Sequence, residues 1–132
     1  MTVRQVEIGL VAADESLVDF YVYAFGLRRV PPSESRSGTL HRLQSDGVSM
    51  KVMVPARPPA AADRTAAFMD VTGLRYLTFH VDDFDATVER VTERGGAVLH
   101  GPLEIGGGRR VAVLCDPDGN TVEVTAGPGP VS

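Results

Sequence analysis

Hydrophobic and polar residues alternate in two separate parts of the chain, and each part also contains a run at helical spacing. In residues 3–11 the alternation predicts a strand that carries Glu7 on the face opposite Leu10. Apolar residues recur at helical spacing after Asp14, an N-cap type of residue, and this run stops at Gly26. The first part of the chain is therefore expected to begin with a strand followed by a helix.

Two more strands and a long connection complete the first half. Residues 39–44, "TLHRLQ", and 48–54, "VSMKVMV", are typical of strands, and "SDG" between them predicts a hairpin turn. After Val30, "PPSESRSG" predicts a polar loop. Residues 55–73 are rich in Pro and Ala without a sustained period, which predicts a connection containing at most a short helical turn.

The pattern then returns in the second half. "LRYLTFHV" alternates as a strand, Asp83 is expected to cap a helix with Phe84 and Val91 on one face, and Gly95 is expected to end it. Three strand-like runs follow: "AVLHG", "RRVAVLC" and "TVEVTA". The last two are joined by "DPDGN", a second hairpin signal.

The two halves can be overlaid as copies of one βαβββ unit. The overlay places Asp14 on Asp83 and Gly26 on Gly95, and it places the Asp-Gly pair at 46–47 on the pair at 118–119. One such unit leaves one face of its sheet bare, so that two units are needed for burial. The predicted architecture is an α+β fold of two tandem βαβββ units.

We expect residues 1–132 to form a single domain with unit 1 at 3–54, a linker at 55–73 and unit 2 at 74–126. Under the overlay, Glu7 falls on Tyr76 and Lys51 on Glu123. These four side chains take equivalent positions on the first and last strands of the units.

Composition removes several classes of function. The net charge is −4 without a basic stripe, which argues against nucleic acid as a partner. No apolar run approaches the roughly 20 residues of a membrane span, and the N-terminus does not resemble a signal peptide, so a cytoplasmic protein is expected. Cys115 is the single cysteine, which leaves no internal disulfide and no Cys-based zinc site.

These features resemble the vicinal oxygen chelate superfamily, which includes glyoxalase I, extradiol dioxygenases and bleomycin-resistance proteins. The resemblance lies in "VEIGLVAADESLVDFYVYAFGL", in "GLRYLTFHVDDFDATVERVTERGGAVLHGP" and in the "DPDGNTVEV" turn and strand, and it spans residues 3 to about 125. It implies a curved, half-open mixed sheet whose cup holds a divalent metal. The implied ligand positions are Glu7, Lys51, Tyr76 and Glu123.

This chain departs from that ligand set. In relatives that bind metal, His or Gln commonly stands at the position of Glu7, Glu at that of Lys51, His at that of Tyr76 and Glu at that of Glu123. Only Glu123 matches this set, and Glu7 is a substitute at the first position. An ammonium group such as that of Lys51 repels a dication. No cofactor is therefore expected, and if an ion does bind, its ligands would be Glu7 and Glu123, with His80 as a further donor.

Two roles are open for the polar residues of the cup. A Lys51–Glu123 pair, with Tyr76 donating to a carboxylate, could be satisfied structure and nothing more. Alternatively, these residues and Glu7 could bind a small organic ligand. His80 shares a strand face with Tyr76 and could join them, whereas His41 reaches either the cup or a surface edge.

Three functions compete. The first is metal-free binding of a small organic molecule, as in the bleomycin-resistance proteins, with a homodimer implied by the resemblance. The second is a lyase, isomerase or ring-opening enzyme, in which Glu7 or Glu123 removes a proton and Lys51 or Tyr76 stabilises the oxyanion. Here burial is expected to raise the pKa of a carboxylate. The third is a metal-dependent glyoxalase or dioxygenase with atypical ligands.

Overall fold

The protein is described by a computed structural model for residues 2–128. The chain divides into two compact units, Met1–Ala62 and Asp63–Ser132. The boundary falls inside the segment 55–73, most of which lies outside the helices and strands. Each unit is therefore described by itself.

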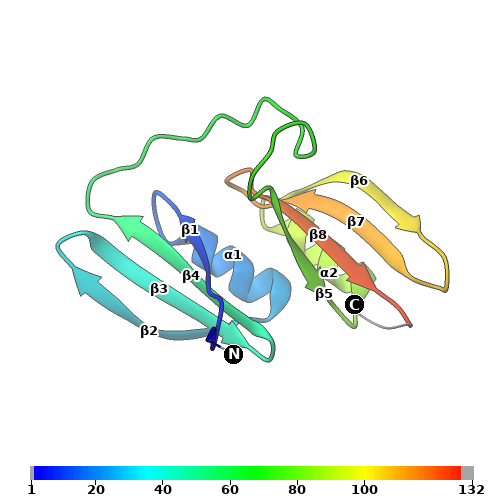
Figure 1. Ribbon diagram of the computed structural model, residues 1–132, viewed down its shortest axis with the longest axis horizontal. Coiled ribbons are helices and arrows are strands. Elements are labelled where there is room, and N and C mark those ends of the chain that lie inside the picture. The colour runs from blue at the N-terminus through cyan, green and yellow to red at the C-terminus, as the bar shows by residue number, and fades with distance from the viewer. Residues whose placement is uncertain (1, 129–132) are drawn as a thin grey trace. The chain divides into compact units, whose positions relative to one another are not determined.

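Unit 1 is a four-stranded sheet with one helix (Figure 1). Its elements are β1 (Ile8–Val11), α1 (Ser16–Phe25), β2 (Arg28–Ser35), β3 (Gly38–Ser45) and β4 (Val48–Pro55). The strand order is β1-β4-β3-β2, with β1 parallel to β4 and the other pairs antiparallel. The first and last strands of the unit thus lie side by side.

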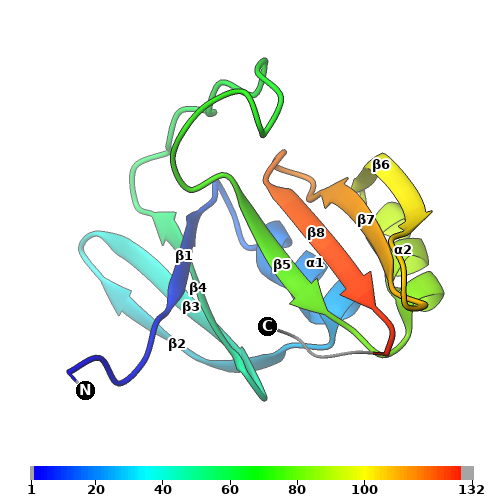
Figure 2. The same ribbon diagram turned by 45° about the vertical axis from the view of Figure 1, so that its right-hand side comes forward.

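Unit 2 repeats this arrangement (Figure 2). Its elements are β5 (Tyr76–His80), α2 (Phe84–Glu93), β6 (Ala97–Glu104), β7 (Arg110–Cys115) and β8 (Thr121–Ala126). The order β5-β8-β7-β6 again pairs the first strand with the last in parallel. The predicted α+β fold with a repeated βαβββ unit is confirmed.

Strand alternation separates an apolar face of each sheet from a polar one. In unit 1, Leu43, Met50 and Val52 are fully buried, and α1 packs against β3. In unit 2, Leu114 and Val124 are buried in the same way, and α2 contacts β6, β7 and β8. Burying such a side chain contributes about 1.5–3 kcal/mol, so these faces hold each unit together. The remaining face, here called the open face, carries the polar residues.

The predicted polar loop after Val30 is wrong. Its first part forms β2, an edge strand paired with β3. The pairing register shifts between Val30 and Ser33, where Pro31 and Pro32 lie. Proline lacks the N–H that a central strand needs, but an edge strand tolerates it at a bulge. The polar composition concealed a strand because β2 has a single neighbour.

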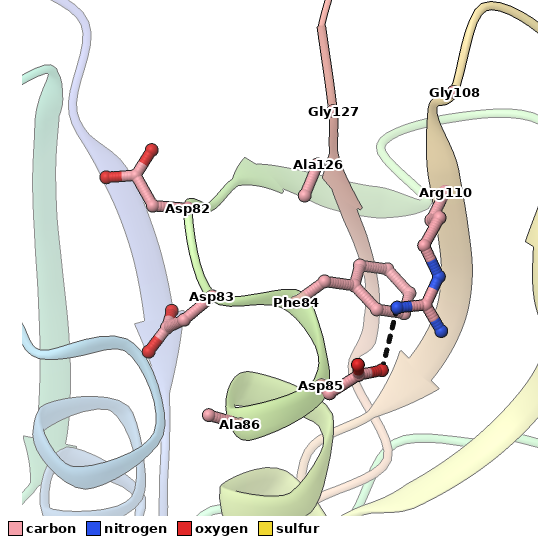
Figure 3. Close-up of a pocket in the computed structure, with 9 residues that line it drawn as sticks. All are labelled: Asp82, Asp83, Phe84, Asp85, Ala86, Gly108, Arg110, Ala126 and Gly127. Carbon is pink, nitrogen blue, oxygen red and sulfur yellow. Dashed lines mark ion pairs between the residues drawn. The ribbon is translucent and has the colours of Figure 1, made fainter.

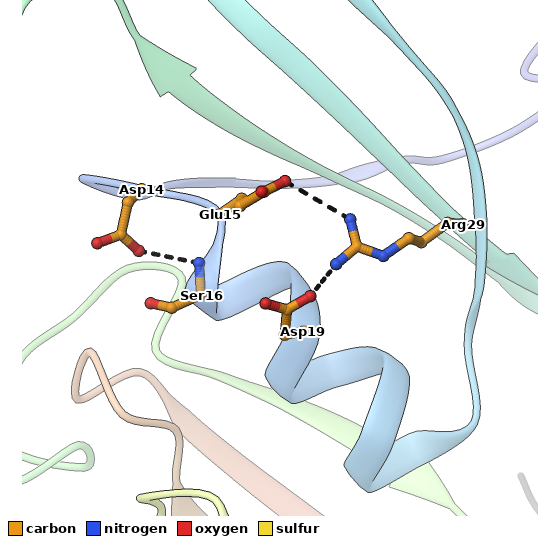
Figure 4. Close-up of polar contacts among 5 residues, drawn as sticks. All are labelled: Asp14, Glu15, Ser16, Asp19 and Arg29. Carbon is orange, nitrogen blue, oxygen red and sulfur yellow. Dashed lines mark hydrogen bonds and ion pairs between the residues drawn. The ribbon is translucent and has the colours of Figure 1, made fainter.

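Helix α1 starts one residue later than predicted. Glu15, not Asp14, is the residue before the helix. The Asp14 carboxylate instead accepts a hydrogen bond from the backbone N–H of Ser16 at 2.9 Å (Figure 4), and the side chain and the backbone N–H of Ser16 together lower the pKa of Asp14. Arg29 of β2 forms ion pairs with Glu15 and Asp19 and so ties the helix to the sheet edge.

The helix ends are partly as predicted. Gly26 follows α1 in the left-handed conformation, with φ of 68°, which confirms it as the C-cap. Asp83 precedes α2 as predicted, and α2 ends at Glu93 with Arg94 as its C-cap, directly before Gly95, whose φ of 93° is in the left-handed region, as predicted. Among the described residues, neither helix has the length and apolar character needed to cross a membrane.

Candidate functional site

The pairing register confirms that the four predicted positions are equivalent in the two units. Lys51 of β4 lies opposite Gly9 of β1. Glu123 of β8 lies opposite Thr78 of β5. Glu7 directly precedes β1, and Tyr76 begins β5. Each unit therefore carries two of the predicted residues on the open face along its parallel strand pair.

In unit 1 these residues form a polar cluster around one carboxylate, here called the Glu7 cluster: Glu7, Arg42, Ser49 and Lys51. Arg42 Nε lies 3.3 Å from Glu7 Oε2, and Ser49 Oγ donates to the same oxygen at 3.4 Å. Lys51 Nζ lies 3.8 Å from Glu7 Oε1. Both carboxylate oxygens of Glu7 thus face donors from β3 and β4.

The cluster has more positive than negative charge. Arg42 and Lys51 lie directly opposite each other on β3 and β4, with Glu7 as their shared carboxylate. The side chains of Arg42 and Lys51 are 37% and 39% exposed. Like charges at directly opposed strand positions repel, so Glu7 stabilises a pair that would otherwise be unfavourable.

This environment corrects one expectation about Glu7. The hydrogen bond from Arg42 lowers the pKa of the Glu7 carboxyl, and the charges of Arg42 and Lys51 act in the same direction. Burial raises the pKa of Glu7 as expected, but these neighbours outweigh it, so the expected rise toward neutrality does not occur at Glu7. A carboxylate held in its charged form by cations is a weak general base.

Unit 2 presents a different set of groups. Burial alternates along β5, so that Tyr76, Thr78 and His80 share the exposed face while Phe79 is buried, as the sequence predicted. Thr78 Oγ1 donates to Glu123 Oε1 at 3.0 Å. The hydroxyl bound to Glu123 thus comes from Thr78, which the sequence analysis did not single out.

Tyr76 contributes an aromatic surface to this face. The residue is 53% exposed, and its ring packs edge-on against Phe68 with the ring centroids 5.4 Å apart. Phe68 belongs to the irregular segment before β5, so this segment extends the apolar surface beside Glu123's sheet. An organic ligand can use such a surface for stacking.

His41 does not belong with the predicted site residues. It is 9% exposed and alternates in β3 with Arg42, so that it lies with Leu43 on the apolar face of the sheet. Arg42 takes the open-face position that the sequence analysis considered for His41. The predicted pair between Lys51 and Glu123 joins residues of different units and stays a prediction.

Arg42 was not predicted as a site residue, although the hairpin turn of unit 1 could have identified it. Asp46 and Gly47 form a two-residue connection, which fixes Ser45 opposite Val48. Counting back along both strands places Arg42 opposite Lys51. The turn signal therefore contained the register, and the register identifies Arg42 as a neighbour of Lys51.

The donor chemistry of either unit does not fit the divalent metal implied by the resemblance. Glu7 is committed to three hydrogen-bond donors or cations, and Lys51 repels a dication. Across residues 2–128, His, Cys, Asp and Glu side chains form no group of three that could hold an ion. Of the four implied ligand positions, those of Lys51 and Tyr76 carry an ammonium and a phenol in place of metal ligands.

A separate pocket lies in unit 2 at the start of α2 (Figure 3). It has a volume of about 400 Å³ and contains none of the predicted site residues. Three of its four charged lining side chains have partners: Arg110 pairs with Asp85 at 2.8 Å, and Asp83 accepts from Thr87. Arg110 also covers the Phe84 ring at 4.5 Å. We place the candidate site on the open faces instead.

Two βαβββ units with polar residues on their paired first and last strands define a protein of the glyoxalase-like, vicinal oxygen chelate class. The chain belongs to the Glyoxalase/Bleomycin resistance protein/Dioxygenase superfamily, whose family model matches residues 9–124. No curated protein sequence matches it.

Several solved structures are similar to the chain. A glyoxalase family protein from Bacillus cereus is 16% identical with a TM-score of 0.80, over 98% of this chain and 97% of that one. The fosfomycin resistance protein FosX from Listeria monocytogenes is 17% identical with a TM-score of 0.71, over 97% and 96%. TnmS3, an antibiotic binding protein from Streptomyces sp. CB03234, is 27% identical with a TM-score of 0.64, over 97% and 99%.

Proposed function

We propose that the protein binds a small organic molecule of the antibiotic or natural-product type, without a metal ion. The observation that carries this proposal is the Glu7 cluster. In it Arg42, Ser49 and Lys51 surround a carboxylate that stands at an implied metal-ligand position. Such a cluster offers hydrogen-bond donors and positive charge to a ligand, and it disfavours a dication.

Two further observations support ligand binding. Tyr76 and Phe68 offer an exposed aromatic surface on unit 2, and Thr78 and Glu123 offer a hydroxyl and a carboxylate beside it. A few polar groups next to apolar surface are typical of small-molecule sites. The likeness to TnmS3, an antibiotic binding protein, favours sequestration as the role.

A thermal-shift screen tests this proposal. The native protein is heated with a panel of natural products and, separately, with zinc, manganese, nickel and iron(II) salts. We expect the midpoint to rise with at least one organic compound, because a ligand that binds only the folded state stabilises it by mass action. Stabilisation by ions alone, with no response to any organic compound, would contradict the proposal.

A second candidate is an enzyme that abstracts a proton next to a carbonyl, and Glu123 favours it. Unlike Glu7, Glu123 accepts its hydrogen bond from a neutral residue, Thr78, so it is the better placed base. The test is exchange of solvent deuterium into ketones and thioesters in the presence of the protein. Exchange that disappears in a Glu123→Gln variant would support catalysis, and no exchange with any compound would remove it.

A further inference from the structure

We propose that the Glu7 cluster recognises the carboxylate group of an acidic organic ligand, with Arg42 and Lys51 as the residues that bind it. This inference rests on the proposed binding of a small organic molecule and names its chemical class. It assigns Arg42 a role in ligand specificity.

The charges of the Glu7 cluster do not balance. Arg42 and Lys51 are direct cross-strand partners, and one carboxylate, that of Glu7, lies between them. The cluster therefore has a formal excess of one positive charge on half-exposed side chains. A monoanionic group bound beside Glu7 would neutralise this excess and relieve the repulsion between the two cations.

Arg42 has spare hydrogen-bonding capacity. Arg42 reaches Glu7 through Nε, and within residues 2–128 its two terminal amino groups take part in no hydrogen bond. A guanidinium can bind a carboxylate through two parallel N–H donors. The terminal amino groups are therefore the donors that a ligand carboxylate would use.

Glu7 holds the two cations loosely. Its contacts with Arg42 and Lys51 measure 3.3 and 3.8 Å, whereas charge-assisted hydrogen bonds are commonly about 2.7–2.9 Å. Glu7 also precedes β1 and lacks the strand pairing, which begins at Ile8. A ligand carboxylate can therefore approach the same cations more closely than Glu7 does.

The ammonium group of Lys51 is accessible from the β1 side. Gly9 lies opposite Lys51 on β1, and a Cβ atom at this position would lie 3.6 Å from Lys51 Cε. A larger side chain at residue 9 would cover the end of Lys51. Glycine leaves that end open on the β1 side.

The experiment compares two probes that differ in one group. Native protein labelled with ¹⁵N is titrated with 2-naphthoate and with neutral 2-naphthamide, and the Arg Nε–H signals and the amide signals of unit 1 are followed by NMR. We expect naphthoate to shift the Arg42 signal and naphthamide to leave it unchanged. Arg42→Gln and Lys51→Gln should each weaken naphthoate binding by roughly tenfold, as the loss of a charge-assisted contact does.

Two more variants sharpen the test. Glu7→Gln removes the competing carboxylate and should tighten naphthoate binding. Arg36→Gln is the matched control, because Arg36 is an exposed arginine of unit 1 in the turn between β2 and β3; its affinity should equal that of the native protein. Thermal midpoints of all variants establish that they are folded, and Glu7→Gln and Lys51→Gln carry the test if Arg42→Gln is not.

The carboxylate proposal is overturned if acid and amide bind equally, if neither binds at millimolar concentration, or if naphthoate binds with unchanged affinity to Arg42→Gln and Lys51→Gln. Each of these results leaves the wider proposal to be judged by the natural-product screen. Stabilisation by neutral natural products, together with any of these results, would mean that the ligand is organic and not acidic.

Discussion

At the scale of single residues, Glu7 shows how neighbours decide the chemistry of a side chain. The sequence places a carboxylate where a metal ligand or a base could stand. Arg42 and Lys51 make this carboxylate the counterion of two cations and lower its pKa. Glu123 is the same residue type, but its carboxylate accepts a hydrogen bond from the neutral hydroxyl of Thr78 and not from a cation.

The lowered pKa of Glu7 predicts a pH dependence. A carboxyl whose pKa is lower in the folded state stabilises it above the unfolded pKa, and this contribution is lost as the pH falls through the folded value. We therefore expect Glu7→Gln to have a lower thermal midpoint than the native protein at pH 7. The two midpoints should converge as the pH falls below 4.5, the ordinary pKa of glutamate.

Thermal unfolding at pH 3 to 8 in a low-salt buffer measures this difference. A Glu34→Gln variant serves as the control, because Glu34 is an exposed glutamate of β2 in the same unit. A gap between native protein and Glu7→Gln that persists unchanged at pH 3 would show that the charge of Glu7 is not its source.

At the scale of elements, turns set which side chains meet. The turn between β7 and β8 is built around Asp116, which is 1% exposed. Its Oδ1 accepts from the backbone N–H groups of Asp118 and Asn120 at 2.9 Å each, and its Oδ2 accepts from the Asn120 side chain at 2.9 Å. This turn holds β8, and with it Glu123, in register against β7.

Asp116→Ala should therefore be costly. The change removes three hydrogen bonds to a carboxylate and leaves two backbone N–H groups without their acceptor. This should lower the free energy of unfolding by roughly 3 kcal/mol. Asp46→Ala is the matched change in the hairpin turn of unit 1, where Asp46 is exposed, and should cost no more than about 0.5 kcal/mol. Urea denaturation of both variants measures the two costs, and equal losses would contradict this account of the turn.

At the scale of the whole molecule, one architecture appears twice with different chemistry in each copy. Both units pair their first and last strands in parallel and bury one sheet face against a helix. Unit 1 fills its open face with cations and one carboxylate, and unit 2 with a carboxylate, hydroxyls and an aromatic ring. The repeat thus preserves the fold while the exposed positions diverge.

This divergence predicts that metals are dispensable. Treatment with a chelator should leave the thermal midpoint of the native protein unchanged, because Lys51 and Arg42 stand where a dication would need oxygen or nitrogen ligands. Elemental analysis of protein purified without chelator is the accompanying measurement. A stoichiometric metal that is lost in Glu123→Gln would contradict the prediction.

The sequence by itself determined the repeated unit, both helices and most strands, because alternation, helical spacing and Asp-Gly turns act locally. It also determined that Tyr76 and His80 share a face and that Lys51 and Glu123 are equivalent. The sequence did not predict strand β2, because an edge strand with a single neighbour can be polar and contain proline.

Only the tertiary structure decided the partners. Glu7 is far in sequence from Arg42, Ser49 and Lys51, and side-chain contacts between them depend on strand pairing across the sheet. The same pairing turned His41 to the buried face and gave Glu123 a donor in Thr78. Charge and hydrogen bonding act through space, so the chemistry of the open faces could be read only once the strands were side by side.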